Sequence, residues 1–260
     1  MPNTIPSWSI SRIQVFEQCA YRAKLQWLDK IPDLQPKTAA DRGSAIHLEA
    51  ENYVQAKGDL THNLRHFAPD LAALKAHHAE GRVTVEEEWA FDRDWRVSEW
   101  KSGWLRLKCD AVCHLSKNHL VVIDHKTGKR FGNEIKHAVQ LQLYAVCALI
   151  RYPEVEQVTC ELWYLDQNEL ASFVLHRRQL ASTLPSSTRR VVNSLRPRTS
   201  SRTRISSRAN TAPITLIVKV IVSTALSSIN KGKWYASASP SSPPKATRLT
   251  TPSQRKRRRI

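Results

Sequence analysis

The spacing of apolar residues over the first 175 positions changes between a helical period and a strand period. A helix is predicted to begin at the N-cap candidates Ser9 and Ser11 and to end before Pro32. Further segments with helical spacing cover about residues 42–56, 69–79 and 133–150. Alternating or continuous apolar runs predict strands over about residues 83–91, 103–115, 119–126, 155–166 and 170–175.

The order of these elements limits the fold class. Helices come first, followed by three strands, a helix and two more strands. This order is typical of an α/β or α+β domain with a mixed central sheet. With 260 residues, the chain is long enough to bury a substantial core of this kind.

The net charge of +17 is unevenly distributed. Residues 170–260 contain 19 Lys and Arg side chains and no Asp or Glu, whereas residues 1–169 contain 21 basic and 23 acidic side chains. The high charge therefore does not by itself mark the first part as a nucleic-acid binder. We expect a folded domain over residues 1–178 and a disordered Ser-, Thr- and Arg-rich tail over residues 179–260.

Three explanations remain open for this tail. It is a cationic arm that binds phosphate, a solvated linker, or a translation in the wrong reading frame. The third explanation is considered because acidic residues normally supply about half of the charged positions. A continuous reading frame in independent isolates would exclude it.

Several classes of protein are not indicated by the sequence. No segment approaches the ~20 apolar residues of a membrane helix, and the first 30 residues lack the pattern of a secretory signal. Five scattered cysteines without a CxxC pair indicate neither a disulfide framework nor a zinc site. We therefore expect a cytoplasmic protein without a membrane partner.

Acidic residues interrupt two of the predicted strands. Asp110 lies inside an otherwise apolar strand, and Asp124 and Lys126 close the next one in the segment VVIDHKTGK. Residues two apart in a strand share a face, and antiparallel pairing would bring Asp110 beside Asp124. Two such carboxylates are costly without a cation between them, and their oxygens suit Mg²⁺ or Mn²⁺. The alternative is a sheet-edge aspartate and a surface ion pair.

Two helical motifs flank these strands. Gly43 and His47 form a GxxxH motif, in which the glycine permits close approach to the sheet and the imidazole can complete a metal shell. Gln140 and Tyr144 lie one turn apart on the following helix, where they can contact a phosphate or Lys126. Taken singly, the histidine is also typical of a structural residue, and the QxxxY pair is also typical of a surface helix.

The set and order of these motifs resemble the PD-(D/E)xK nuclease superfamily. The similarity is greatest to the exonuclease branch that includes the RecB nuclease domain and related phage-encoded and CRISPR-associated nucleases. It rests on VVIDHKTGK followed by QLQLYA, and on SISRIQVFEQCAYRAK, which is similar to the opening helix of that branch. The resemblance covers about residues 7–175 and implies a restriction-endonuclease-like fold, with a mixed central sheet flanked by helices.

The resemblance also implies roles for individual residues. Asp110, Asp124 and Lys126 match the catalytic residues of the superfamily. His47, Asp110 and Asp124 match the ligands of its catalytic cation, which we expect to be Mg²⁺ or Mn²⁺.

Two further sets of residues follow from the same resemblance. Gln140 and Tyr144 match a motif that binds substrate by positioning the DNA and the lysine. A third acidic residue is expected at Glu88 in the first strand or, as a weaker candidate, at Glu51, one helical turn beyond His47.

The cysteines mark a departure from this branch, some members of which hold an iron–sulfur cluster. Cys19 occupies the place of the first cluster ligand, but no cysteine follows Cys160. We therefore expect no cluster in the chain as written, and we interpret Cys19 as a small buried residue. Cys109 and Cys113, four apart in one strand, are expected to share a face.

The function implied by the resemblance is metal-dependent hydrolysis of phosphodiester bonds in DNA. The expected enzyme is an exonuclease of recombination or repair in a bacterial or phage-infected cell. DNA is the expected partner, and no recombination or helicase partner is identified. Two alternatives remain open, namely a non-catalytic nucleic-acid-binding protein that binds through the tail, and a decayed nuclease.

Overall fold

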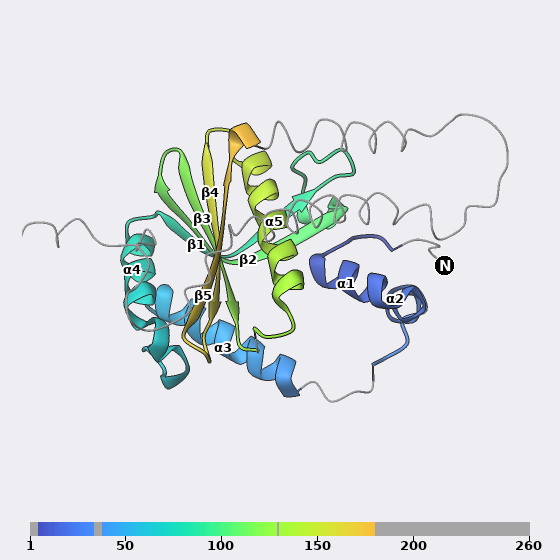
Figure 1. The fold of residues 1–260 in the computed structure, drawn as a ribbon, viewed down its shortest axis with the longest axis horizontal. Helices are drawn as coiled ribbons and strands as arrows, with labels where there is room; N and C mark the ends of the chain where they lie inside the picture. Colours follow the sequence, from blue (N-terminus) through green and yellow to red (C-terminus); the bar gives the residue numbers. More distant parts are fainter. Residues whose placement is uncertain (1–4, 34–37, 129, 180–260) are drawn as a thin grey trace, which may run out of the picture.

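The computed structural model describes residues 5–33, 38–128 and 130–179, so the predicted tail lies almost wholly outside the described residues. Within them, five strands form one mixed sheet with helices on both sides (Figure 1). This arrangement confirms the predicted α/β class and the restriction-endonuclease-like architecture.

The helices lie close to the predicted segments. They are α1 (Ile10–Gln18), α2 (Ala20–Trp27), α3 (Thr38–Val54), α4 (Ala68–Ala79) and α5 (Glu134–Arg151), with two short 3-10 helices, η1 (His62–Phe67) and η2 (Trp100–Ser102). In the described part of the chain, none of these helices combines the length and the apolar character that crossing a bilayer requires.

One predicted helix is in fact two. The backbone of Cys19 is extended, with φ of −158° and ψ of 104°, and it separates α1 from α2. Its thiol is exposed and accepts a hydrogen bond from the backbone N–H of Arg22 at 3.4 Å. The interpretation of Cys19 as a buried residue is therefore wrong, because the side chain caps the N-terminus of α2.

The strands follow one another across the sheet in chain order. They are β1 (Val83–Phe91), β2 (Leu105–Ser116), β3 (His119–Lys126), β4 (Gln157–Tyr164) and β5 (Glu169–His176). β3 and β4 are parallel and are joined through α5, whereas the other neighbours are antiparallel. β2 and β3 are therefore interior strands, and the predicted alternative of a sheet-edge position for Asp110 is wrong.

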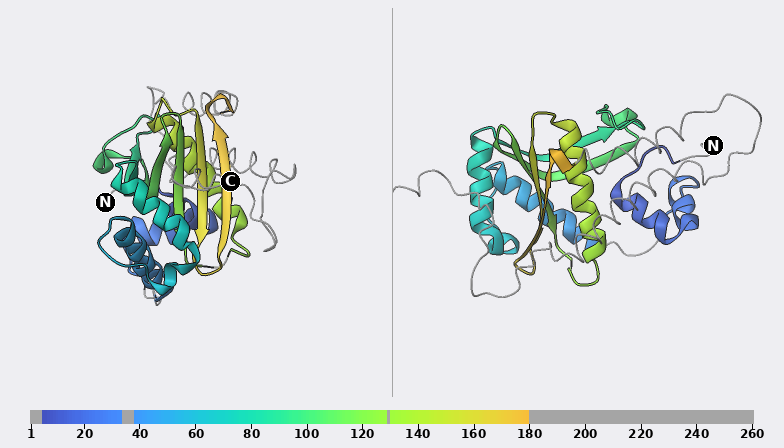
Figure 2. Two further views of the ribbon diagram at one scale, coloured as in Figure 1. Left: turned by 90° about the vertical axis from the view of Figure 1, so that its left-hand side faces the viewer. Right: turned by 45° about the horizontal axis from the view of Figure 1, so that its top comes forward.

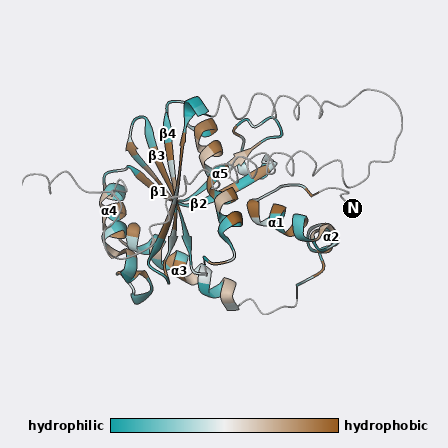
Figure 3. Ribbon diagram, in the orientation of Figure 1, coloured by the Kyte–Doolittle hydropathy of each residue, from teal (hydrophilic) through white to brown (hydrophobic). Residues whose placement is uncertain are grey.

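The sheet separates two layers of helices. α3 and α4 pack on one face and α5 covers the other, while α1 and α2 lie beside the outer ends of β1 and β2 (Figures 1 and 2). Residues 138–149 of α5 are all buried, and hydrophobic positions follow this helix and the strands beside it (Figure 3). Gln140 and Tyr144 are among these buried residues, so the surface-helix alternative for the QxxxY pair is also wrong.

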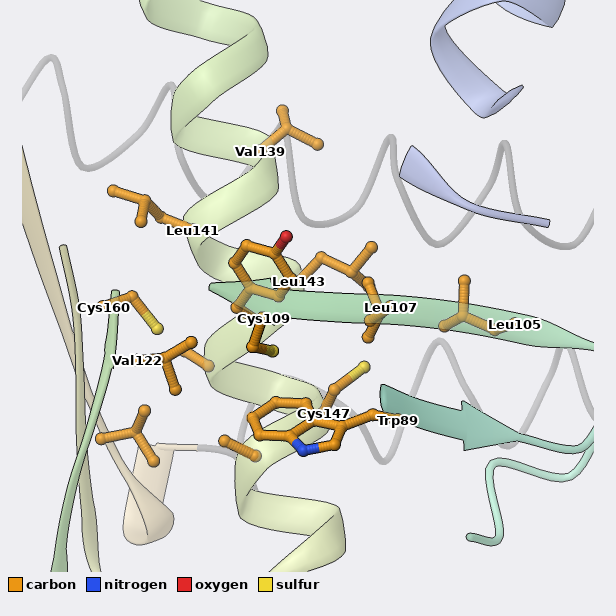
Figure 4. Packing of buried hydrophobic residues seen from close by; sticks show 14 of the residues in the cluster. Trp89, Leu105, Leu107, Cys109, Val122, Val139, Leu141, Leu143, Cys147 and Cys160 are labelled. Atoms are coloured by element: carbon orange, nitrogen blue, oxygen red, sulfur yellow. The ribbon is translucent and has the colours of Figure 1, made fainter. Parts of the chain in front are cut away.

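The ribbon of β1 and β2 changes face in its middle. On β2, Leu107 and Cys109 pack against α5 (Figure 4), whereas Ala111 and Cys113 belong to the core cluster that contains α3 and α4. The expectation that Cys109 and Cys113 share a face is therefore wrong, because the regular alternation of side chains is interrupted between them.

The change of face occurs at Asp110 on β2 and at Glu86, which lies opposite it on β1 between the paired residues. Glu86 has a φ of 55°, a left-handed conformation that is rare for a residue of this size. On either side of it, Val83 packs with the α3 and α4 cluster and Trp89 with the α5 cluster. The bend therefore places two carboxylates at the point where the ribbon leaves the main sheet.

The end of α5 is fixed by a residue that follows β5. The guanidinium group of Arg177 donates hydrogen bonds to the carbonyl oxygens of Val155, Leu149 and Tyr152 at 2.7, 2.9 and 2.8 Å. Carbonyl groups at the C-terminus of a helix have no partner within the helix, and a cation there also interacts favourably with the helix dipole. Arg177 therefore connects the edge of the sheet to the helix that carries Gln140 and Tyr144.

We expect the substitution Arg177→Met to lower the free energy of unfolding by about 2 kcal/mol, because it leaves three carbonyl groups without their charged donor. Arg178→Met is the matched control, since Arg178 is exposed, and we expect it to change stability by less than about 0.5 kcal/mol. Urea unfolding of the full chain measures both values. Equal values for the two variants would contradict this assignment.

Candidate active site

Two aspartates meet where β2 and β3 diverge. The strands pair antiparallel up to Ala111 and Ile123, so that Asp110 and Asp124 are the next residues to face each other. Asp124 is 5% exposed, and the side chain of Asp110 is 11% exposed. The predicted juxtaposition of the two carboxylates is therefore present, at the inner end of two central strands.

Asp124 has hydrogen-bond donors on one oxygen only. Its Oδ1 accepts hydrogen bonds from Nε2 of Gln140 at 2.8 Å and from the hydroxyl of Tyr144 at 3.2 Å. Its Oδ2 lies against the ammonium group of Lys126 but, within the described residues, accepts no well-directed hydrogen bond. Burial raises the pKa of Asp124, and the positive charge of Lys126 opposes that rise.

Asp110 is held by two histidines. Its Oδ1 lies 3.2 Å from Nδ1 of His47 on α3, and its Oδ2 accepts a hydrogen bond from the backbone N–H of His125 at 2.6 Å. Burial would raise the pKa of Asp110, but the hydrogen bond with His47 and the adjacent imidazoles outweigh it and lower that pKa. Burial would likewise lower the pKa of His47, and its contact with Asp110 raises it. The two groups therefore favour an ion pair.

His125 was not singled out by the sequence, although it stands between Asp124 and Lys126. Its ring is buried beside Trp163, with ring centroids 5.6 Å apart, and burial lowers the pKa of His125 to about 4. The ring is therefore neutral at pH 7, and its backbone N–H is the group that positions Asp110.

A third carboxylate comes from β1. Ligand atoms of His47, Glu86 and Asp110 all lie within 4.8 Å of one another. Glu88, the expected third acid, is exposed, and Glu51, the weaker candidate, lines the same cavity as the three. The sequence signal was the run Glu86–Glu88, but which of its members turns inward depends on the left-handed backbone at Glu86.

The cluster borders a cavity of about 520 Å³ between α3 and the β1–β2 ribbon. Its lining includes Gly43 and His47 from α3, and Glu86, Lys108 and Asp110 from the ribbon. A Cβ atom added at Gly43 would lie 3.2 Å from Oγ1 of Thr127, directly after β3. The small residue of the GxxxH motif therefore allows α3 to approach the end of β3 closely, as predicted.

The donor set fits a divalent cation. An imidazole nitrogen and two carboxylate oxygens converge from α3, β1 and β2, and such ligands suit Mg²⁺ or Mn²⁺. Nearby, Oδ2 of Asp124 is buried and accepts no well-directed hydrogen bond from the described residues, and the ammonium group of Lys126 compensates its charge. Asp110, Asp124, Lys126 and His47 are thus brought together, and their catalytic and metal-binding roles stay predictions.

Gln140 and Tyr144, which were expected to bind substrate, lie beside Asp124 in the interior of the domain. Both side chains are buried, and both donate to Asp124, while the Tyr144 hydroxyl also lies 3.1 Å from the carbonyl oxygen of Lys108. In this structure the motif positions the carboxylate of Asp124. A contact with DNA stays a prediction.

Comparisons with known proteins agree with this geometry. A profile of the PD-(D/E)XK nuclease superfamily matches residues 7–206. No curated protein matches the chain.

Two solved structures are similar at low identity. One is the crystal structure of SSO0001, with 13% identity, a TM-score of 0.33, and coverage of 68% of this chain and 74% of that chain. The other is a protein from Eubacterium rectale named as a candidate exonuclease, with 11% identity, a TM-score of 0.40, and coverage of 83% and 81%. The family assignment rests on the superfamily profile.

We expect Gln140→Leu to lower the free energy of unfolding by about 1–3 kcal/mol in the presence of a chelator, because buried Asp124 loses one of its donors. Gln18→Leu, at an exposed position on α1, is the matched control. Denaturant unfolding measures the difference. A Gln140→Leu variant as stable as the control would show that the hydrogen bond to Asp124 is not formed.

The backbone at Glu86 gives a second prediction about stability. We expect Glu86→Gly to be more stable than Glu86→Ala by about 1 kcal/mol, because only glycine adopts a left-handed φ without cost. Both variants lose the carboxylate, so their difference isolates the backbone. In an ordinary strand alanine is the more stable of the two, and that order in thermal or urea unfolding would contradict the observed conformation.

Proposed function

Because the chain belongs to the PD-(D/E)xK nuclease superfamily, we propose that it is a metal-dependent deoxyribonuclease that hydrolyses phosphodiester bonds. The observation that carries the proposal is the convergence of His47, Asp110, Asp124 and Lys126 from three separate elements, with His47 and Asp110 lining a cavity. They come from α3, β2 and β3, three segments that are separate in the sequence and meet only in the folded chain.

The residues have distinct tasks in this proposal. His47 and Asp110 hold the cation together with Asp124, and Glu86 offers a further ligand atom within 4.8 Å of those of His47 and Asp110. A divalent cation held there neutralises charge that develops on the phosphate and activates a water molecule. The Lys126 ammonium, kept in place by Asp124, orients the attacking water and stabilises the same developing charge. Gln140 and Tyr144 fix the Asp124 carboxylate on which Lys126 depends.

We further propose that the enzyme acts on DNA ends, as an exonuclease of recombination or repair. The support is the similarity of VVIDHKTGK and QLQLYA to the exonuclease branch of the superfamily. His47, the histidine of the GxxxH motif, belongs to the same pattern. Magnesium and manganese are both compatible with the donor set.

The test is degradation of end-labelled linear DNA and of circular DNA by the full chain, with Mg²⁺ or Mn²⁺ and with chelator. We expect degradation only with metal, and on linear DNA only. Asp124→Asn and Lys126→Met should each lower the rate by about 100-fold or more. Asp94→Asn and Lys117→Met, which change the same residue types away from the site, should retain the wild-type rate.

Other outcomes identify the alternatives. DNA binding without metal-dependent degradation would favour a non-catalytic nucleic-acid-binding protein. Loss of cooperative unfolding together with inactivity would favour a decayed nuclease. Cleavage of circular DNA would retain the nuclease and exclude strict exonuclease action.

A further inference from the structure

Lys108 is a charged residue of the cavity that the proposed chemistry does not use. It lies on β2 two residues before Asp110, and its side chain is 53% exposed. It is the one Lys or Arg side chain among the described residues that line the cavity, which otherwise carries His47, Glu51, Glu86 and Asp110. A polyanion that enters this cavity meets mostly negative charge, and Lys108 offers the attractive contact.

The ammonium group of Lys108 is already engaged. It forms an ion pair with Glu86, although the residue directly across from Lys108 in the strand register is Glu88. The hydrogen bond to Glu86 raises the pKa of Lys108, so its ammonium group stays protonated at neutral pH. The carboxylate of Glu86 therefore takes part in two arrangements. It pairs with the ammonium group of Lys108, and it belongs to the possible cation site with His47 and Asp110.

A cation bound beside Glu86 would compete with Lys108 for this carboxylate. A divalent ion beside Glu86 attracts the carboxylate and repels the ammonium group at short range, and both interactions are strong in a partly buried site. The Lys108 backbone stays in place, because it belongs to β2 and pairs with Glu88 of β1. A bound cation would therefore displace only the flexible side chain of Lys108.

We propose that Lys108 binds a backbone phosphate of the DNA, and that Glu86 holds Lys108 back until the cation is bound. The proposal rests on the proposed nuclease function and adds a substrate-positioning residue to it. Phosphate binding by Lys108 then depends on the metal, so that DNA enters the cavity only when the cation required for cleavage is present.

The test measures DNA binding in a Lys126→Met background, in which turnover is blocked. Fluorescence anisotropy of a labelled duplex gives the association constant over a range of salt concentrations, with Mg²⁺ and with chelator. With Mg²⁺, Lys108→Gln should reduce the slope of log affinity against log salt by about 1. With chelator, the same substitution should leave the slope unchanged, because Glu86 already neutralises Lys108.

Two further variants keep the proposal independent of how well Lys108→Gln folds. Glu86→Gln should tighten metal-free DNA binding and steepen its salt slope by about 1, and the double variant with Lys108→Gln should cancel this gain. Calorimetric titration of Lys108→Gln with Mg²⁺ should show tighter metal binding, because the competing ammonium group is gone. Lys117→Gln, at the far turn of β2 and β3, removes the same charge and should change none of these values.

Two results overturn the proposal. An unchanged slope for Lys108→Gln with Mg²⁺ would mean that Lys108 binds no phosphate, and an equal reduction with and without Mg²⁺ would mean that Glu86 does not control it. Failure of the nuclease function is seen separately. In that case the chain carrying native Lys126 leaves DNA intact, while the binding measurements still decide the role of Lys108.

Discussion

The burial of Asp124 is the constraint on which the rest of the site depends. A carboxylate that is almost inaccessible to water must be compensated by donors and cations around it. Gln140 and Tyr144 supply the donors from α5, and Lys126 supplies a positive charge from the same strand. That positive charge lies against Oδ2 of Asp124, the oxygen that accepts no well-directed hydrogen bond from the described residues. The buried carboxylate therefore lowers the stability of the fold at the candidate active site.

The bend of the β1–β2 ribbon is the second feature that positions the carboxylates of the site. A regular ribbon would place its whole apolar stripe on one face, and Glu86 and Asp110 would lie along a flat surface. The left-handed backbone at Glu86 divides the stripe between two core clusters instead. The local strain is balanced by packing on both sides, and strained backbone of this kind is characteristic of functional sites.

Much of the fold and the positions of Asp110, Asp124 and Lys126 in the site could be predicted from the sequence, because both depend on periodicity and local spacing. The strands over 83–91 and 119–126 are examples, and so is the position of Asp110 and Asp124 just beyond the paired residues of β2 and β3. The break at Cys19 and the separation of Cys109 from Cys113 could not be predicted in this way, because they depend on single backbone angles. The inward position of Glu86, where Glu88 was expected, has the same cause.

The most direct test of the central claim is the binding of Mn²⁺ to the isolated full chain, followed by calorimetry or by electron paramagnetic resonance, in the absence of DNA. If His47, Asp110 and Asp124 form one cation site, the wild-type chain binds the ion at that site and Asp110→Asn abolishes this binding, while Asp94→Asn retains it. Wild-type and Asp110→Asn chains that bind Mn²⁺ equally, or a wild-type chain that binds none, would contradict the account.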